Sequence, residues 1–191
     1  LPNEIQNMQL EKPTSGPIFD VVQRARAAQA VVDSYDQARV DELVDAAAWA
    51  IIEPTRNQSL AERAVADTGI GNVADKVRKN YRKTLGLLRD LKGVKSVGVI
   101  ARDPQNGITE IARPVGVVCA ITPSTNPGAT PANKIINAIK GRNAVIVAPS
   151  PKGLGTATEL VAYIHAQFDR IGAPRDLVQV LPAPINKQAT A

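Results

Sequence analysis

The chain has 191 residues and a mass of 20.3 kDa, which corresponds to roughly one domain. Hydrophobic residues make up 44% and charged residues 21%, close to the averages of globular proteins, so an intrinsically disordered chain is excluded. The longest apolar run, residues 115–121, is too short to cross a bilayer, and one cysteine with one histidine excludes a disulfide framework and a zinc cluster. No signal-peptide pattern opens the chain. We therefore expect a soluble, cytoplasmic protein without a membrane partner or a metal.

The net charge is mildly positive, +5 from 23 basic and 18 acidic residues. The basic residues concentrate between positions 76 and 95. A solvated helix face is the favoured interpretation, while attraction for an anionic cofactor or a nucleic acid is the alternative. Only Tyr81 in this stretch could stack on a base, so we expect no nucleic-acid partner.

Four helices are predicted after an extended leading segment over residues 1–16. The sequence Gly16-Pro17 opens the first helix, because proline is favoured in the first helical turn. The second ends before Pro54. Residues 59–62 (SLAE) form a capping-box pattern that predicts the start of the third, and Asn72 can cap the fourth. The expected apolar faces are Ile18, Val21, Val22, Ala25, Ala28 and Val32; Val40, Leu43, Val44, Ala47 and Ile51; and Val73, Val77, Tyr81, Leu85 and Leu88.

A β-hairpin is predicted next. Residues 97–101 and 108–112 are short strand-like runs, and residues 103–107 between them carry the turn residues Pro104 and Asn106-Gly107. Such a hairpin has long edges, which proteins cover or pair with another chain.

The last part of the chain alternates strands with helices. Strands are predicted over residues 115–121, 144–147 and 177–181. One helix opens at Thr130-Pro131 and a second begins near Thr156. This β-α-β-α-β order implies right-handed crossovers and a parallel sheet, so the fold class is α/β with half of a doubly wound sheet.

Ligands of open parallel sheets bind beyond the carboxyl ends of the strands. Residues 122–128 (TPSTNPG) and 148–153 (APSPKG) follow the first two predicted strands there. They offer hydroxyls, amides and one cation, but they match neither the G-x-G-x-x-G fingerprint nor the phosphate loop.

These two loops resemble the aldehyde dehydrogenase superfamily. Residues 113–127 (RPVGVVCAITPSTNP) look like the first strand of that family's Rossmann-type cofactor domain, and residues 140–151 (KGRNAVIVAPSP) resemble the next strand and its loop. Residues 68–72 (TGIGN) and 172–178 (GAPRDLV) also fit. The resemblance extends over nearly the whole chain from about residue 19.

The resemblance is strongest to the branch that transfers the acyl group to coenzyme A. Many hydrolytic members have an aromatic residue before the loop asparagine, where this chain has Thr125, and a lysine where it has Ala148. Within the acylating branch the sequence looks most like sulfoacetaldehyde and acetaldehyde dehydrogenases.

This resemblance implies an enzyme that oxidises a small aldehyde to its acyl-CoA with NAD or NADP, through a cysteine thioester. Asn126 matches the family's oxyanion-hole asparagine, a neutral donor where negative charge grows on the carbonyl oxygen. The alternative reading of Asn126 is a turn residue before proline. Thr122, Pro123 and Ser124 are expected to line the cofactor cleft with their backbone. Thr125 is expected either to pack beside the nicotinamide or to cap the turn.

Ser150, Pro151 and Lys152 match the family's adenosine-ribose region, although an ordinary strand-to-helix loop is the alternative. Lys152 could pair with a 2′-phosphate, and the choice between NAD and NADP stays open. The only cysteine, Cys119, lies within a predicted strand and is expected to be a buried apolar residue, so the nucleophile is expected beyond residue 191.

The implied organisation has three parts. Residues 1–94 form the N-terminal helical part of the cofactor domain, residues 95–113 a hairpin arm for a dimer or tetramer, and residues 114–191 the first half of the dinucleotide-binding sheet, with the catalytic domain absent. A hydrolytic NAD(P)-dependent aldehyde dehydrogenase and a non-catalytic nucleotide-binding or assembly module remain the alternatives.

Overall fold

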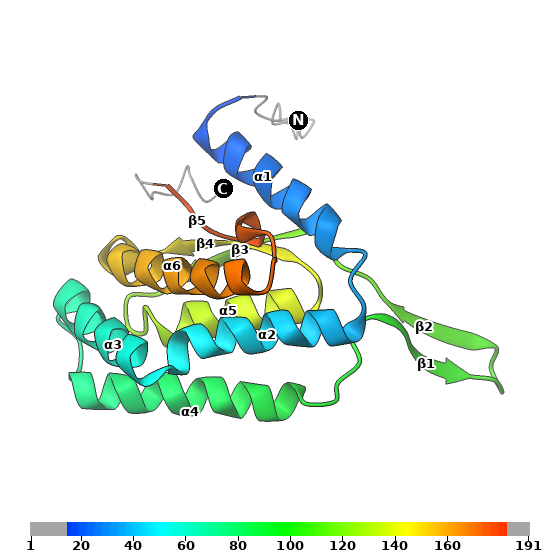
Figure 1. Cartoon of the computed structure of the whole chain (residues 1–191), viewed down its shortest axis with the longest axis horizontal. Helices are drawn as coiled ribbons and strands as arrows, with labels where there is room; N and C mark the ends of the chain where they lie inside the picture. The colour runs from blue at the N-terminus through cyan, green and yellow to red at the C-terminus, as the bar shows by residue number, and fades with distance from the viewer. Residues whose placement is uncertain (1–14, 183–191) are drawn as a thin grey trace, which may run out of the picture.

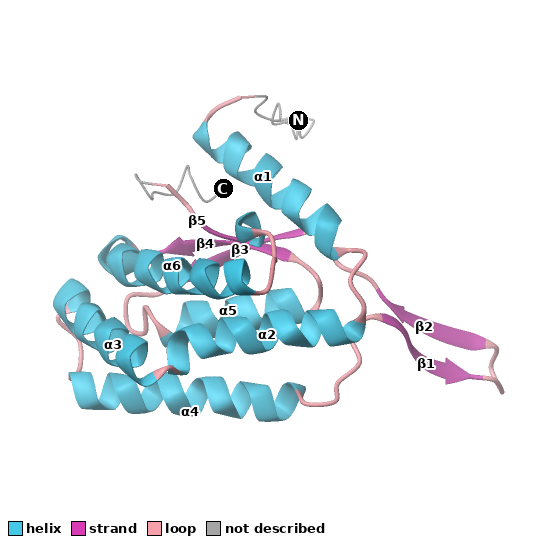
Figure 2. Cartoon of the chain, in the orientation of Figure 1, coloured by secondary structure: helices cyan, strands magenta, loops and turns pink. Residues whose placement is uncertain are grey.

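A computed structural model describes residues 15–182, in which four helices and a hairpin precede strands and helices that alternate, as in the α/β class. Figure 2 shows the strands in two groups, a ribbon that stands apart and a sheet among the helices. The leading segment predicted over residues 1–16 lies almost wholly outside the described residues. The elements are α1 Pro17–Val32, α2 Gln37–Ile52, α3 Pro54–Thr68, α4 Val73–Leu91, β1 Gly98–Asp103, β2 Ile108–Ala112, β3 Val117–Thr122, α5 Ala129–Lys140, β4 Ala144–Pro149, α6 Leu154–Arg170 and β5 Val178–Val180.

The sheet is parallel, with the strand order β3-β4-β5. Helix α1 lies on one face, and α5 and α6 cover the other (Figure 1). Both crossover helices therefore lie on the same face of the sheet, as expected for half of a doubly wound sheet. Every residue of β4 is buried, because this strand has a neighbour on each side and helices on both faces.

Helix α2 forms a second layer beneath α5 and α6, and α3 and α4 pack outside it (Figure 1). Its predicted apolar face is buried, including Leu43 and Ile51, which are fully buried. Ile139 of α5 and Phe168 of α6 belong to the same core. Within residues 15–182, no helix is long and apolar enough to span a membrane.

The predicted start of the third helix is wrong. Helix α3 begins at Pro54, five residues before the capping-box pattern, and the side chain of Glu53 caps it. The Glu53 carboxylate accepts hydrogen bonds from the backbone N–H of Arg56 at 2.9 Å and of Thr55 at 3.1 Å. Ser59 lies inside the helix, where its hydroxyl donates to Glu159 at 2.6 Å. The cap predicted at Asn72 is confirmed, since its Oδ1 accepts from the N–H of Asp75.

This cap makes the stability of the protein depend on pH. Hydrogen bonds from the backbone N–H groups of Arg56 and Thr55 lower the pKa of Glu53. The stabilisation is therefore present above the pKa of glutamate in the unfolded chain and is lost as the pH falls through the depressed pKa of the folded state. We expect Glu53→Gln to lower the melting temperature at neutral pH, with a difference from wild type that disappears in acid.

Melting curves across pH test this expectation. Glu62→Gln is the matched control, because it removes the same charge from the same helix without touching an unpaired backbone N–H group. A difference between Glu53→Gln and wild type that stays constant down to strongly acidic pH contradicts the assignment of Glu53 as the cap.

The apolar line predicted for the fourth helix reaches the core only at its end, where Leu88 is partly buried against it. The buried positions of α4 are Lys76, Asn80 and Thr84, one helical turn apart, whereas Tyr81 and Leu85 of the predicted line are exposed. Two of these buried side chains form hydrogen bonds, Lys76 with the loop before α5 and Asn80 with α3. Asn80 Nδ2 donates to Asn57 Oδ1 at 2.9 Å.

The predicted hairpin is confirmed and extends away from the helices and the sheet (Figure 1). Strands β1 and β2 pair antiparallel, with an irregular register between Val99 and Ala101. Its apolar side chains are exposed, among them Ile108 at 53% and Ile111 at 57%. An isolated two-stranded ribbon of this kind is marginally stable in water.

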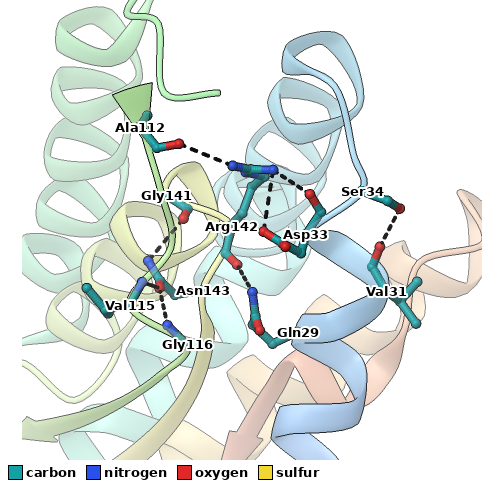
Figure 3. Close-up of polar contacts among 10 residues, drawn as sticks. All are labelled: Gln29, Val31, Asp33, Ser34, Ala112, Val115, Gly116, Gly141, Arg142 and Asn143. Carbon is teal, nitrogen blue, oxygen red and sulfur yellow. Dashed lines mark hydrogen bonds and ion pairs between the residues drawn. The ribbon is translucent and has the colours of Figure 1, made fainter. Parts of the chain in front are cut away.

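A buried arginine joins the root of the hairpin to the sheet (Figure 3). The guanidinium of Arg142, just before β4, donates to the carbonyl of Ala112 at the end of β2 at 3.3 Å and to the carbonyl of Asp33 after α1. Its Nη1 also lies 3.5 Å from the Asp33 carboxylate, and Gln29 donates to its carbonyl at 3.2 Å. Arg142 has a φ of 58°, a left-handed backbone that non-glycine residues rarely adopt, so the contacts hold it there.

Candidate active site

The two loops singled out in the sequence lie side by side. In the parallel register Thr122, the last residue of β3, pairs with Pro149, the last residue of β4. The backbone N–H of Ser150 donates to the carbonyl of Thr122 at 2.9 Å. The expected cofactor residues Thr122, Pro123, Ser124, Thr125, Ser150, Pro151 and Lys152 therefore follow adjacent strand ends, as does Asn126.

Two hydroxyls at this edge have no protein partner among the described residues. They are Thr122 Oγ1 and Ser150 Oγ, and both atoms are buried. The loops also pack closely, since a Cβ on Gly153 would lie 3.0 Å from Pro127 Cβ and 3.5 Å from Ser150 Oγ. Buried polar atoms without partners are uncommon in folded proteins, so these two hydroxyls distinguish this edge as a candidate for binding a polar ligand.

The side chain of Asn126 is held by a lysine from α4. Lys79 Nζ donates to Asn126 Oδ1 at 2.9 Å. An ammonium group only donates hydrogen bonds, so the oxygen of the amide must face Lys79. Within residues 15–182, the amide Nδ2 has only Thr125 Oγ1 as a partner, at a long 3.4 Å. The N–H groups of Asn126 thus remain available to a carbonyl oxygen.

The backbone on both sides of Asn126 is fixed as well. Lys76 Nζ donates to the carbonyl of Thr125 at 2.7 Å, and the carbonyl of Asn126 accepts from the N–H of Thr130 at 3.2 Å, which joins it to the first turn of α5. Asn80 lies against Gly128, where a Cβ would be 3.4 Å from Asn80 Oδ1. This loop is therefore a rigid support for a donor.

Lys76 is unusually buried for a lysine, with an exposed fraction of 7%. Burial lowers the pKa of Lys76, and the positive charge of Lys79 lowers it further. Neither lysine stands out in the sequence as a site residue, because the basic stretch 76–95 is typical of a solvated helix face. The signal that could have revealed Lys76 is the repeat of polar residues at positions 76, 80 and 84, which places three of them on one face of a helix.

Cys119 is not buried as predicted. It lies on β3 and is exposed, because β3 is an edge strand and α1 leaves part of this face of the sheet uncovered. Ile121, two residues further on the same face, is 67% exposed. Partial burial raises the pKa of the Cys119 thiol, which disfavours the thiolate, so the structure gives no activated nucleophile at this position.

Two hollows adjoin Asn126. One of about 270 Å³ is lined by residues before and within α4 together with Thr125. The other, of about 350 Å³, lies between α4 and α5. Among the residues that the structure describes, no group of three histidine, cysteine or carboxylate side chains could hold a metal ion. The arrangement can therefore orient an amide donor beside a polar crevice.

Comparison with known proteins gives consistent matches. Residues 6–191 match the model of the "Aldehyde dehydrogenase family". A sulfoacetaldehyde dehydrogenase (acylating) from Cupriavidus necator is 64% identical over 191 residues, which are 100% of this chain and 39% of the relative. The chain thus spans about two-fifths of the length of this relative.

Two solved structures extend the comparison to the fold. An acetylating aldehyde dehydrogenase from Geobacillus thermoglucosidasius superposes with a TM-score of 0.84 at 36% identity, over 90% of this chain and 37% of the other. A propionaldehyde dehydrogenase from Rhodopseudomonas palustris, with CoA bound and an acylated cysteine, gives a TM-score of 0.75 at 26% identity, over 85% of this chain and 36% of the other.

Proposed function

Since the chain belongs to the aldehyde dehydrogenase family, we propose that the full-length protein oxidises a small aldehyde to its acyl-CoA with NAD or NADP. The single observation that carries this proposal is the geometry of Asn126, whose oxygen is held by Lys79 while its N–H groups stay available beside the strand ends. The names of the similar proteins, which are acylating enzymes, support the same reaction.

The aldehyde we propose is a short one that carries an anionic group, with sulfoacetaldehyde as the leading candidate. The support is the 64% identity to a sulfoacetaldehyde dehydrogenase (acylating) over the whole length of this chain. Because the chain spans about two-fifths of that relative, the substrate of the full-length protein is a proposal that requires its own test.

In the proposed reaction Asn126 acts on the carbonyl oxygen. When a cysteine thiolate adds to the aldehyde carbon, the carbonyl π-bond breaks and its electron pair moves to oxygen, which becomes an oxyanion. The amide N–H of Asn126 donates a hydrogen bond to that oxygen and stabilises the developing charge. Lys79 fixes the amide so that the nitrogen and not the oxygen faces the substrate, which avoids reorganisation during the reaction.

The edge formed by Thr122 and Ser150 fits a nicotinamide dinucleotide, because two buried hydroxyls there are unpartnered. Such a cofactor, when bound, supplies a hydride acceptor. We propose that Thr122, Pro123, Ser124 and Thr125 line the cleft and that Ser150, Pro151 and Lys152 contact the ribose. The exposed Lys152 offers a cation to a 2′-phosphate, which NADP carries and NAD lacks.

We place the nucleophile outside residues 1–191. An acylated cysteine is present in the Rhodopseudomonas palustris structure, whereas the thiol of Cys119 has a raised pKa and lies on an edge strand. Loss of hydride from the cysteine adduct leaves a thioester. Attack by the thiol of CoA then forms the new C–S bond, breaks the old one and returns the cysteine. CoA is thus a co-substrate.

Steady-state assays of the purified full-length protein test the proposal. We expect reduction of NAD or NADP by sulfoacetaldehyde to depend on CoA, with acyl-CoA as the product identified by mass spectrometry. Oxidation that proceeds equally well without CoA and yields the free acid would show a hydrolytic enzyme. Cofactor binding without turnover in the presence of aldehyde and CoA would show a non-catalytic module.

We also propose that the protein is a homo-oligomer that uses the β1–β2 ribbon as its arm. The support is the exposure of Ile108 and Ile111 on a ribbon that extends away from the remainder of the chain (Figure 1). The edges of such a ribbon present unpaired backbone groups that a second chain can use.

A further inference from the structure

The hollow of about 350 Å³ beside Asn126 has a distinctive lining. It lies between α4 and α5, which pack against each other. Lys79 and Lys83 are four residues apart on α4 and so share one helix face. The complete lining is Lys79, Lys83, Asn126, Ala129, Thr130, Asn133, Lys134 and Asn137. It contains three lysines and no carboxylate.

Two of these lysines, Lys83 and Lys134, have no ion-pair partner among the described residues. In contrast, elsewhere on α4 Arg78 is paired with Asp75 at 3.3 Å and Arg89 with Asp90 at 2.9 Å. The hollow therefore has a positive potential that favours an anion.

Because the hollow lies next to Asn126, an anion bound in it can be the charged substituent of the aldehyde. Asn126 lines the hollow. The loop that carries Asn126 leads back to Thr122 at the end of β3, which lies beside Ser150, and there we propose that the dinucleotide binds. An aldehyde whose oxygen contacts the amide of Asn126 and whose hydrogen faces the cofactor must direct its remaining substituent away from the cofactor. Of the two hollows that Asn126 lines, the smaller one also contains the carboxylate of Asp75, so the hollow between α4 and α5 is the one that suits an anionic substituent.

We infer that Lys83 and Lys134 bind the anionic end of the aldehyde and thereby determine the specificity of the enzyme. A sulfonate presents three acceptor oxygens, and each ammonium offers three donors without a fixed orientation, so lysines suit this group. In a two-carbon aldehyde the sulfonate lies next to the carbonyl group, which agrees with a hollow that has Asn126 in its wall. This inference rests on the function proposed above and assigns residues to its substrate selectivity.

The phosphates of CoA are a second source of tetrahedral anions. They would use the same ammonium donors, so affinity for an anion alone cannot distinguish them from a sulfonate. Kinetic measurements can distinguish the two sources, because CoA takes part in the reaction of every aldehyde, whereas the sulfonate belongs to only one of the two aldehydes compared. The ratio of kcat/KM for a sulfonated aldehyde to kcat/KM for a neutral aldehyde measures recognition of the sulfonate. Any effect of a variant on CoA binding cancels in this ratio.

The experiment compares sulfoacetaldehyde with propionaldehyde in the full-length protein at saturating CoA, using Lys83→Gln, Lys134→Gln and the double variant. We expect the kcat/KM ratio to fall roughly fivefold for each lysine, as removal of a partly solvated ion pair gives. Lys83→Arg, which keeps the charge, should retain most of the ratio. Lys95→Gln is the matched control, because Lys95 is exposed and lies outside the hollow.

Ionic strength provides an independent measurement. For wild type, kcat/KM for sulfoacetaldehyde should fall more steeply with added salt than kcat/KM for propionaldehyde, because salt screens the attraction between charges. The double variant should lose most of this difference. Equal salt dependence of the two aldehydes in wild type would contradict the inference.

The remaining outcomes separate this inference from the proposed function. If the variants raise the KM for CoA and leave the aldehyde ratio unchanged, the lysines serve CoA and the inference is overturned. If both aldehydes are oxidised and neither the ratio nor the KM for CoA changes, the inference fails while the proposed function stands. If neither aldehyde is oxidised by wild type, the proposed function fails and the inference fails with it.

Discussion

Replacement of Asn126 by alanine is expected to lower kcat of the full-length protein about 100- to 1000-fold, the cost of removing one oxyanion-hole donor. The variant loses the 2.9 Å hydrogen bond from Lys79 and the 3.4 Å contact with Thr125, and because both are solvent-exposed the fold should lose little stability. KM for the aldehyde should change far less than kcat, since the hydrogen bond strengthens as charge develops on oxygen. Initial rates across aldehyde concentrations measure both constants.

Two further variants make this prediction specific. Asn126→Asp keeps the shape and can still accept from Lys79, but an ionised carboxylate has no hydrogen to donate, so it should be at least as impaired as alanine. Lys79→Met leaves the amide in place without its orienting donor and should lower kcat by a smaller factor, on the order of tenfold. An Asn126→Ala enzyme that retains more than a tenth of wild-type kcat would remove Asn126 from the reaction.

Introduction of two carboxylates on the hairpin is expected to dissociate the proposed oligomer. In Ile108→Asp/Ile111→Asp, charges replace two side chains that are more than half exposed in the single chain. If a second copy covers them, burial of unpaired carboxylates disfavours association strongly. Light scattering coupled to size-exclusion chromatography should show a fall from a dimer or tetramer to the monomer mass.

The control adds the same charge to the same ribbon. Gln105→Asp/Thr109→Asp introduces two carboxylates at exposed polar positions without removing an apolar side chain, and it should keep the wild-type mass. Circular dichroism should show that the helices of both variants remain intact. An unchanged mass for the isoleucine variant would refute the role of the ribbon in assembly.

Much of the fold could be predicted because local signals agreed with the tertiary structure. The β-α-β-α-β order, the hairpin turn and the apolar face of α2 follow from periodicity and turn residues. The start of α3 could not be predicted, because residues 59–62 form a good capping box that competes with Glu53-Pro54 as the start of the helix. A proline at the first helical position and a carboxylate before it are an equally valid start, and the structure uses this one.

Only part of the candidate site could be predicted, because some of its residues are far apart in the sequence. The loops after β3 and β4 are visible because their residues are consecutive in the sequence. The lysines that hold them are not, since Lys76 and Thr125 are 49 residues apart and Lys79 and Asn126 are 47 apart. A contact of this kind depends on how α4 packs against the start of α5, which no local pattern specifies.

Burial of individual side chains was also misjudged where an element has an open side. Cys119 and Tyr81 fall on apolar patterns typical of a core, and both are exposed. Periodicity shows which face of an element is apolar, but the face is buried only if another element covers it. Within residues 15–182, β3 lies at the edge of the sheet, and its face that carries Cys119 and Ile121 is covered only in part.

The contacts of Arg142 have a consequence for the thermodynamics of assembly. A ribbon on a flexible tether samples many directions, and docking it costs the entropy of choosing one. Arg142 binds the carbonyl of Ala112 at the root of the ribbon and, at the same time, Asp33 in the body of the molecule (Figure 3). The direction of the ribbon is thus restricted within the single chain, so in the proposed oligomer part of the ordering that association requires is completed when the monomer folds.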